Sequence, residues 1–260
     1  MNLIKAELLK LVYARRNYGL LLASIAISVL GAAFSPYAMS KLTTLMPNPL
    51  GTADAIDGIY AKALGGYMFT LILGVIIMAS EFNQHTAIST YLAAPKRYQP
   101  LLAKLIVAAA AGAIVNFIAT WVGMGSAAIA LSFYPDAATP HDYIWLDYSA
   151  VSLLTGAVLA LIGVGIGSLI RNQNAAVTTG LIWIFLVDRI LALLFTDVGK
   201  WLPTGLITAM MNLKLDVKAQ GISINTADYL EPWPAAGMLL LYGVVFAVIS
   251  LVTSSRRDID

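Results

Sequence analysis

The fold is decided by residues 105–131, LIVAAAAGAIVNFIATWVGMGSAAIAL, a run without any charged side chain. About 20 apolar residues in a helix are enough to cross the hydrocarbon core of a bilayer, which is about 30 Å thick. A helix satisfies its own backbone hydrogen bonds, and the run lacks the alternating pattern of a membrane β-barrel strand. The sequence therefore predicts a transmembrane helix in this segment.

Five further runs of the same kind occur, and the composition agrees with them. Hydrophobic residues make up 59% of the 260 residues and charged residues 12%, whereas a soluble domain has about 45–50% apolar and about 25% charged residues. These figures exclude a water-soluble globule and a disordered chain. We expect an all-α polytopic membrane protein made of one transmembrane domain, residues 1–260. The six predicted spans are residues 18–39, 59–80, 105–131, 150–170, 175–195 and 235–253.

The first run follows Arg15 and Arg16 and could be mistaken for a secretory signal peptide. Its apolar stretch is longer than the 7–15 residues typical of such signals, so we interpret it as a retained span. With the N-terminus in the cytoplasm, most of the 16 Lys and Arg residues lie on the inner side, and most acidic residues lie outside. Lys62 is one of the cations assigned to the outer side. The sequence predicts that both termini are cytoplasmic.

Residues 1–17 form a basic segment ahead of the first span. Ile4, Leu8 and Leu11 share one face of a helix, which favours a helix lying on the cytoplasmic membrane surface. Such a helix either contacts a partner as well or serves only to anchor the topology, and both interpretations stay open. The basic residues expected at the lipid headgroups are Lys5, Lys10, Arg15 and Arg16.

The longest polar connection, residues 196–234, is predicted to lie outside. It contains an apolar stretch, residues 205–213, that is too short to span, so we expect an interfacial or re-entrant outer helix after Trp201 and Pro203. Met210 and Met211 lie in this stretch. Their flexible thioethers suit an adaptable apolar binding surface, although such residues more often simply fill space.

Catalytic signatures are missing from the sequence. The chain has no Cys and two His, and His85 and His141 fall on opposite sides of the predicted membrane. A metal site or a Ser/His/Asp triad is therefore not expected. There is no phosphate-binding loop of the G-x-x-x-x-G-K-[ST] type, so we expect that ATP does not bind to this chain. We expect neither an enzyme nor a nucleic-acid partner.

Two features inside the spans indicate contacts with other helices: a charged pair and a pair of glycines. Asp188 and Arg189 are the one charged pair within a span, and ionisable residues there usually face protein or a wet cavity. The pair belongs to a translocation path or a second protomer, or it makes a structural ion pair to another helix or reaches the outer surface; the structural interpretation is favoured. Gly163 and Gly167 form a small-x-x-x-small step, which predicts close helix packing within the chain or across a dimer.

The connection between the second and third spans has its own pattern. Glu81 ends the second span, a polar helical turn follows, Pro95 stops the helix, and Lys104 opens the third span. This pattern indicates a short amphipathic helix across the inner membrane surface, able to transmit movement from a soluble partner. The alternative is an inert loop that satisfies the positive-inside bias.

This connection resembles that of the ABC-2 family of membrane subunits of ATP-binding-cassette transporters. The resemblance extends to the basic N-terminal helix, the six spans, the tight connection at 171–174 and Trp201-Leu202-Pro203 before the last span. The chain departs from the family in having His85 where a Gly is common. The matching residues, which the resemblance implies form the coupling element that docks on the ATPase, are Glu81, Phe82, Thr86, Leu92, Pro95, Lys96, Arg97 and Lys104.

The resemblance implies a permease subunit of an ATP-driven exporter in the bacterial plasma (inner) membrane. Two permease chains, as a homo- or heterodimer, would assemble with two ATPase subunits that bind ATP and Mg²⁺. The segment after Trp201 would form re-entrant helices that close the pathway. The lack of charges in the spans favours an amphiphilic cargo, such as a drug, a peptide or a lipid-like molecule. The rival functions are a membrane scaffold or immunity protein that sequesters a toxic peptide, and an intramembrane enzyme.

Overall fold

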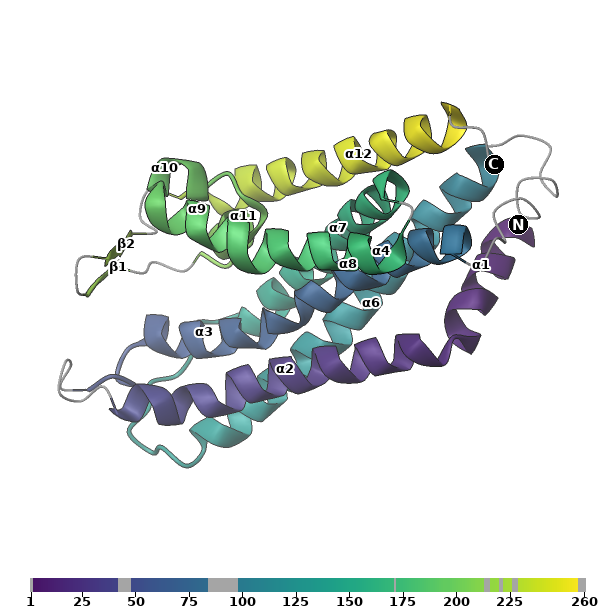
Figure 1. The fold of residues 1–260 in the computed structure, drawn as a ribbon. Coiled ribbons are helices and arrows are strands. Elements are labelled where there is room, and N and C mark those ends of the chain that lie inside the picture. Colours follow the sequence, from purple (N-terminus) through teal and green to yellow (C-terminus); the bar gives the residue numbers. More distant parts are fainter. Residues whose placement is uncertain are drawn as a thin grey trace.

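The computed structural model describes residues 2–41, 48–83, 98–170, 172–212, 216–219, 222–225 and 229–256. Long helices dominate it, and a short two-stranded antiparallel hairpin stands beside them (Figure 1). The helices are α1 (Asn2–Tyr13), α2 (Arg15–Ser40), α3 (Ala53–Ala61), the 3₁₀-helix η2 (Lys62–Gly66), α4 (Tyr67–Asn83), α6 (Tyr98–Leu131), α7 (Ile144–Leu169), α8 (Gln173–Ile182), the π-helix η3 (Trp183–Val187), α9 (Asp188–Leu194), α10 (Thr196–Gly199), α11 (Pro203–Met210) and α12 (Pro232–Arg256), and the strands are β1 (Asp216–Ala219) and β2 (Ile222–Asn225).

Six of these helical segments are long and apolar enough to cross a membrane. The prediction of an all-α protein with six candidate spans is thereby confirmed, and the chain has the character of a multi-pass membrane protein. Its orientation in the membrane stays a prediction. The observed segments are Arg15–Ser40, Ala53–Ser80, Tyr98–Leu131, Ile144–Leu169, Gln173–Ala192 and Pro232–Thr253.

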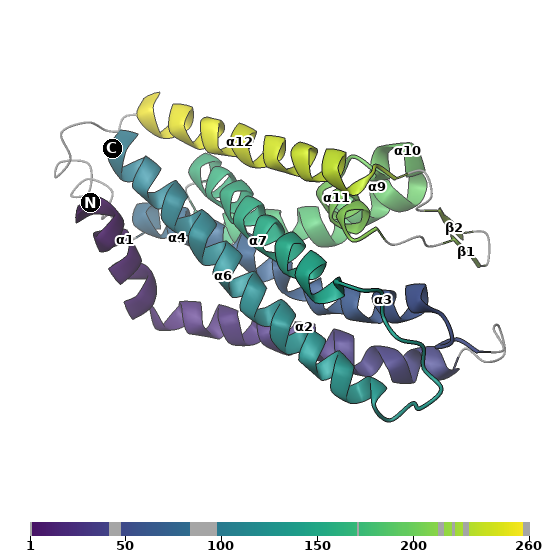
Figure 2. The ribbon, with the colours of Figure 1, turned by 180° about the vertical axis from the view of Figure 1, so that it is seen from behind.

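The spans run up and down through the bundle, so that the N- and C-terminal ends lie at the same end of the molecule (Figures 1 and 2). We call this end, which carries α1, the N-terminal end, and the end that carries α10, α11 and the hairpin the loop end. An even number of spans requires this arrangement. The N-terminal end corresponds to the predicted cytoplasmic side.

The core lies between α4, α6 and α7. In the most apolar part of each span, 78% of the residues are buried in the second span and 67% in the fourth, against 17% in the first. The first, fifth and sixth spans therefore present broad apolar faces outward, which suits contact with lipid or another subunit. The fold is a rigid inner group of helices flanked by less buried ones.

Small residues bring α4 and α7 into backbone contact. A Cβ added at Gly163 would collide with the carbonyl oxygen of Leu71, and one at Gly167 would lie 2.9 Å from the carbonyl oxygen of Val75. Gly74 of α4 faces the Ala160 backbone in the same way. The predicted close-packing residues thus face another helix of the same chain.

The second, third and fourth spans begin six or seven residues before their predicted starts at 59, 105 and 150, and the second span shows why. It begins at Ala53, where the Thr52 hydroxyl accepts a hydrogen bond from the Ala55 amide and caps the helix. Lys62, which was assigned to the outer side, therefore lies within the helical run. Asp54 and Asp57 lowered the local hydropathy, so a composition argument placed the start one and a half turns too late.

The fifth span and the outer segment also depart from the simple expectation. The π-helix η3 interrupts the span at Trp183–Val187. The apolar outer stretch forms α11, preceded by the short α10, and a hairpin follows that was not predicted. At the other end, the Asn172 side chain accepts from the amides of Asn174 and Ala175 and starts α8 directly after α7.

Candidate functional site

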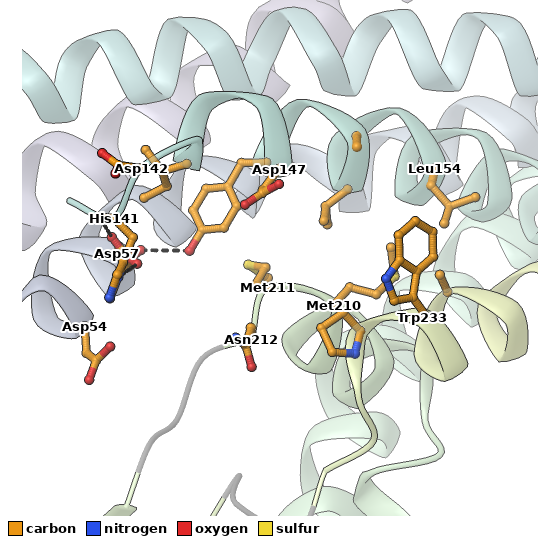
Figure 3. Close-up of a pocket in the computed structure, with 16 residues that line it drawn as sticks. Asp54, Asp57, His141, Asp142, Asp147, Leu154, Met210, Met211, Asn212 and Trp233 are labelled. Carbon is orange, nitrogen blue, oxygen red and sulfur yellow. Dashed lines mark hydrogen bonds and ion pairs between the residues drawn. The ribbon is translucent and has the colours of Figure 1, made fainter.

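A cavity of about 660 Å³ opens at the loop end of the bundle (Figure 3). Side chains from α3, the segment before α7, α7 itself, the end of α11 and the start of α12 line it. This volume lies in the range of about 300–1,000 Å³ found for small-molecule sites. The cavity is the candidate functional site of the described part of the chain.

Four carboxylates line one side of the cavity. Asp54 and Asp57 lie one turn apart on α3, Asp142 precedes α7, and Asp147 lies in the first turn of α7. None of the described residues that line the cavity is Lys or Arg. The side of the cavity formed by these residues is therefore strongly acidic.

One of these carboxylates is held by His141. The ring Nδ1 lies 2.5 Å from Asp57 Oδ2, and the His141 amide donates to Asp57 Oδ1 at 3.1 Å. The Tyr148 hydroxyl donates to the Asp57 carbonyl oxygen at 3.1 Å. The hydrogen bond to Asp57, together with its negative charge, raises the pKa of His141. These contacts fix the segment before α7 onto α3.

The other side of the cavity is apolar. Met210 and Met211 come from the end of α11, Leu154 from α7, and Trp233 from the start of α12 (Figure 3). The Trp233 side chain is 87% exposed. Indole rings at this position are typical of a membrane interface, and they also stack on organic cations.

The chemistry of the cavity is that of a binding site. Within the ranges that the structure describes, no three His, Asp or Glu side chains gather as metal ligands. The carboxylates are therefore spread over the wall and do not converge on one point. Such a wall suits an extended ligand better than a single ion.

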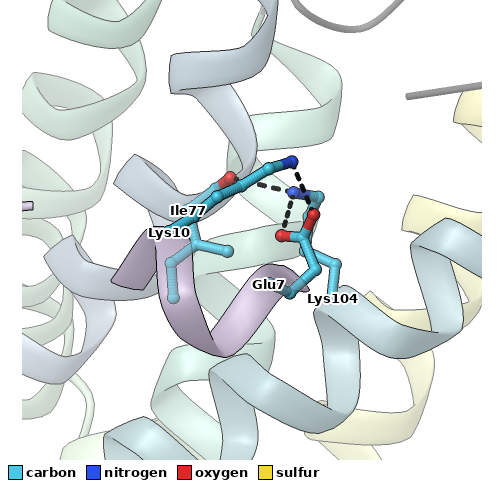
Figure 4. A network of polar contacts seen from close by, with 4 residues as sticks. All are labelled: Glu7, Lys10, Ile77 and Lys104. Atoms are coloured by element: carbon cyan, nitrogen blue, oxygen red, sulfur yellow. Dashed lines mark hydrogen bonds and ion pairs between the residues drawn. The ribbon is translucent and has the colours of Figure 1, made fainter. Parts of the chain in front are cut away.

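A second polar network lies at the N-terminal end (Figure 4). Glu7 of α1 accepts from Lys104 Nζ at 2.9 Å and from Lys10 Nζ at 2.7 Å, and Lys104 also reaches the carbonyl oxygen of Ile77 on α4 at 3.5 Å. Burial alone would raise the pKa of Glu7, but Lys104 and Lys10 outweigh it and lower the pKa. The network fastens α1 to α6 and α4.

Asp188 is buried at the other end of the bundle, and its partner is α11. Thr204 Oγ1 donates to Asp188 Oδ1 at 2.5 Å, and the Thr204 amide donates to Oδ2 at 3.3 Å. Arg189 is exposed. The two neighbours thus differ in burial: Asp188 is buried and caps the first turn of α11 from a neighbouring helix, whereas Arg189 is exposed.

The remaining predicted residues are placed as follows. Glu81 and Phe82 end α4, but their side chains lie outside the described residues, as do Thr86, Leu92, Pro95, Lys96 and Arg97. Lys5 near the start of α1 is exposed, as are Arg15 and Arg16 at the start of α2. Pro203 is buried at the start of α11, and the Trp201 carbonyl oxygen accepts from the Tyr242 hydroxyl of α12 at 3.2 Å.

The sequence analysis placed Met210 and Met211 in a possible binding surface but missed the acidic wall. Asp54, Asp57, Asp142 and Asp147 lie close to the start of two spans, and the sequence indicated only that most acidic residues lie on the outer side. A signal was present, because acidic residues cluster in both of these loops without a neighbouring Arg. That they line the same cavity depends on the packing of α3 against the segment before α7.

Comparisons with known proteins add no assignment to these sites. No family model matches the chain, and no curated protein matches it either.

Proposed function

We propose that the chain is the permease subunit of an ATP-driven exporter of the bacterial plasma membrane, which moves an amphiphilic cargo. ATP and Mg²⁺ would bind to a separate ATPase subunit, and a second permease chain would complete the transporter. The observation that carries this proposal is the N-terminal end of the bundle, where Glu7 and Lys104 fasten a surface helix to the inner helices.

At the N-terminal end, a movement of a soluble partner can be transmitted to the inner helices, because α1 is attached to α6 and α4. The α4 helix ends and α6 begins at the same end of the bundle as α1 (Figure 1), and the sequence between them is the one that resembles a coupling element. The α6 helix has 34 residues, which corresponds to about 50 Å of length. A movement of α1 or of this connection would therefore be carried along α6 to the opposite end.

The loop end has the parts that a gate requires. The short helices α10 and α11 lie at the loop end of the bundle (Figure 1), and Asp188 fastens α11 to the fifth span. Tyr242 links the segment before α11 to the last span. A tilt of the spans would therefore move these helices together with the wall of the cavity.

The test begins with the native complex. The full chain, tagged and purified from its own host, is expected to carry a soluble ATP-hydrolysing subunit with it, identified by mass spectrometry. The double variant Lys96→Ala/Arg97→Ala should reduce the rate of cargo transport about tenfold, while the chain is still inserted into the membrane. The control is Lys41→Ala, an exposed cation directly after α2 at the loop end, which should leave transport unchanged. A chain that purifies without an ATPase contradicts the proposal.

A second candidate is a membrane-bound sequestering protein, and the acidic cavity is the observation that favours it. Such a protein would protect cells from a toxic cationic peptide at the outer surface without using ATP. Protection that persists when the ATPase subunit is deleted would support this candidate over the exporter.

A further inference from the structure

The cavity at the loop end combines three features that define a ligand class. It is large enough for a small organic molecule, one wall carries four carboxylates, and the opposite wall carries thioethers and an exposed indole. Figure 3 shows the two walls on separate sides, with Asp54, Asp57 and Asp142 on one side and Met210 and Trp233 on the other. We infer that this cavity binds an organic cation with an apolar body.

Ion pairs among the described residues do not neutralise most of the carboxylates of the cavity wall. His141 offsets Asp57, while no ion pair to Lys or Arg is found for Asp54, Asp142 or Asp147 within the described part of the chain. Carboxylates of like charge along one wall repel each other, and this repulsion is relieved when a cation binds. The three unpaired carboxylates are therefore the groups that select the sign of the ligand.

Helix electrostatics explain part of the acidic wall but not all of it. Asp54 and Asp147 lie in the first turns of α3 and α7, where a carboxylate interacts favourably with the helix dipole. This effect would operate wherever the two helices began. It does not account for Asp142, which lies outside a helix, or for the apolar wall that faces all three side chains.

The apolar wall indicates that the bound cation has an apolar body. A hydrated metal ion gains nothing from Met210, Met211 and Leu154, and no metal-ligand cluster occurs among the described residues. An aryl or alkyl body can bury itself against these side chains, and its positive centre can stack on the Trp233 indole. The ligand class is therefore a lipophilic cation.

This inference deepens the proposed function, because the bound cation would be the cargo of the exporter. The binding step itself requires only this chain. Equilibrium binding of tetraphenylphosphonium to the full chain in zwitterionic nanodiscs, without any ATPase, therefore tests the cavity separately. Tetraphenylborate, an anion of the same shape, is the matched probe, and empty nanodiscs correct for partition into lipid.

We expect saturable binding of tetraphenylphosphonium and none of tetraphenylborate. Each of Asp54→Asn, Asp142→Asn and Asp147→Asn should weaken the affinity about two- to fivefold, and the triple variant at least about tenfold, because exposed ion pairs are individually weak. Trp233→Ala should weaken it about threefold. Asp136→Asn, an exposed carboxylate of the same connection outside the cavity, is the control and should bind like the wild type.

Equal binding of the two probes, or unchanged affinity in a triple variant with a wild-type melting temperature, would overturn the inference. If the cation binds as expected but no ATPase copurifies, the cavity assignment holds and the exporter fails. If the ATPase copurifies and the cation does not bind, the exporter holds and the ligand class is wrong.

Discussion

The two ends of the bundle both gather charged side chains, but they handle the charge differently. At the N-terminal end, Glu7 is buried and contacts Lys10 and Lys104, so acid and base are matched within one network. At the loop end, the carboxylates of the cavity wall face an open space without a Lys or Arg among its described lining residues. Matched, buried charges hold helices together, whereas unmatched, accessible charges are available to a ligand.

From this difference we expect the N-terminal end to contribute mainly to stability and the loop end mainly to ligand binding. Removing one member of a buried pair leaves the other charge desolvated, so the N-terminal network is expected to govern stability. Removing one carboxylate from a repelling group costs the fold little, so the cavity wall is expected to govern binding. The following predictions test that division, beginning with the largest effect.

Lys104→Met should destabilise the protein most, because it leaves the Glu7 carboxylate buried without its deepest partner. Breaking a buried ion pair typically lowers the free energy of unfolding by about 3–5 kcal/mol. Unfolding by denaturant in detergent micelles measures the loss. Lys10→Met is the matched control, since the Lys10 side chain is 50% exposed and an exposed pair is worth about 0–1 kcal/mol. Equal losses in both variants would show that the network is not a buried structural element.

Gly163→Ala tests the close contact between α4 and α7. The added methyl group would collide with the Leu71 carbonyl oxygen, so α4 and α7 must move apart. Overpacking of this kind lowers the free energy of unfolding by about 1–3 kcal/mol.

Gly125→Ala on α6 is the control for that substitution, because no atom of another described element lies within 4 Å of the added Cβ. It should be neutral or stabilising by up to about 1 kcal/mol through helix propensity. The same unfolding measurement applies to both, and a neutral Gly163→Ala variant would contradict the close contact of α4 and α7.

Thr204→Val should weaken the attachment of α11 to the fifth span. It removes the hydroxyl that donates to the buried Asp188, and a hydrogen bond to a charged group is worth about 1.5–3 kcal/mol. Proteolysis within α11 should accelerate together with the loss of stability. Thr208→Val serves for comparison, since among the described residues the Thr208 hydroxyl bonds to the Thr204 carbonyl oxygen, one turn earlier on the same helix, and not to Asp188. Identical behaviour of the two variants would exclude a special role for Asp188.

The pH dependence of the loop end should be the smallest effect. Asp57 raises the pKa of His141, so the stabilisation from this pair is fully present below the ordinary His pKa of about 6.5 and is lost as the pH rises through the raised value. The melting temperature of the wild type should therefore decline relative to that of His141→Gln as the pH rises beyond the ordinary His pKa of about 6.5. Asp57→Asn should abolish the same difference. A decline that persists in both variants would assign the pH dependence to other groups.

Features that depend on neighbouring residues in the sequence were predictable, whereas contacts between distant segments were not. The spans were predictable because each depends on the hydropathy of its own residues, and errors arose where polar residues such as Asp54 begin a span. The outer helix was anticipated from the apolar stretch after Pro203, but its attachment to Asp188 was not. Asp188 and Arg189 were considered together, although only Asp188 is buried.

By itself, the sequence determined that this chain forms six apolar helices, because a buried backbone in lipid has few other ways to satisfy its hydrogen bonds. Only the tertiary structure decided which charges meet. Glu7 and Lys104 are 97 residues apart, and Asp57 and His141 are 84 residues apart. Such pairs form because close packing of α4, α6 and α7 fixes where each helix ends, and no local pattern encodes that registration.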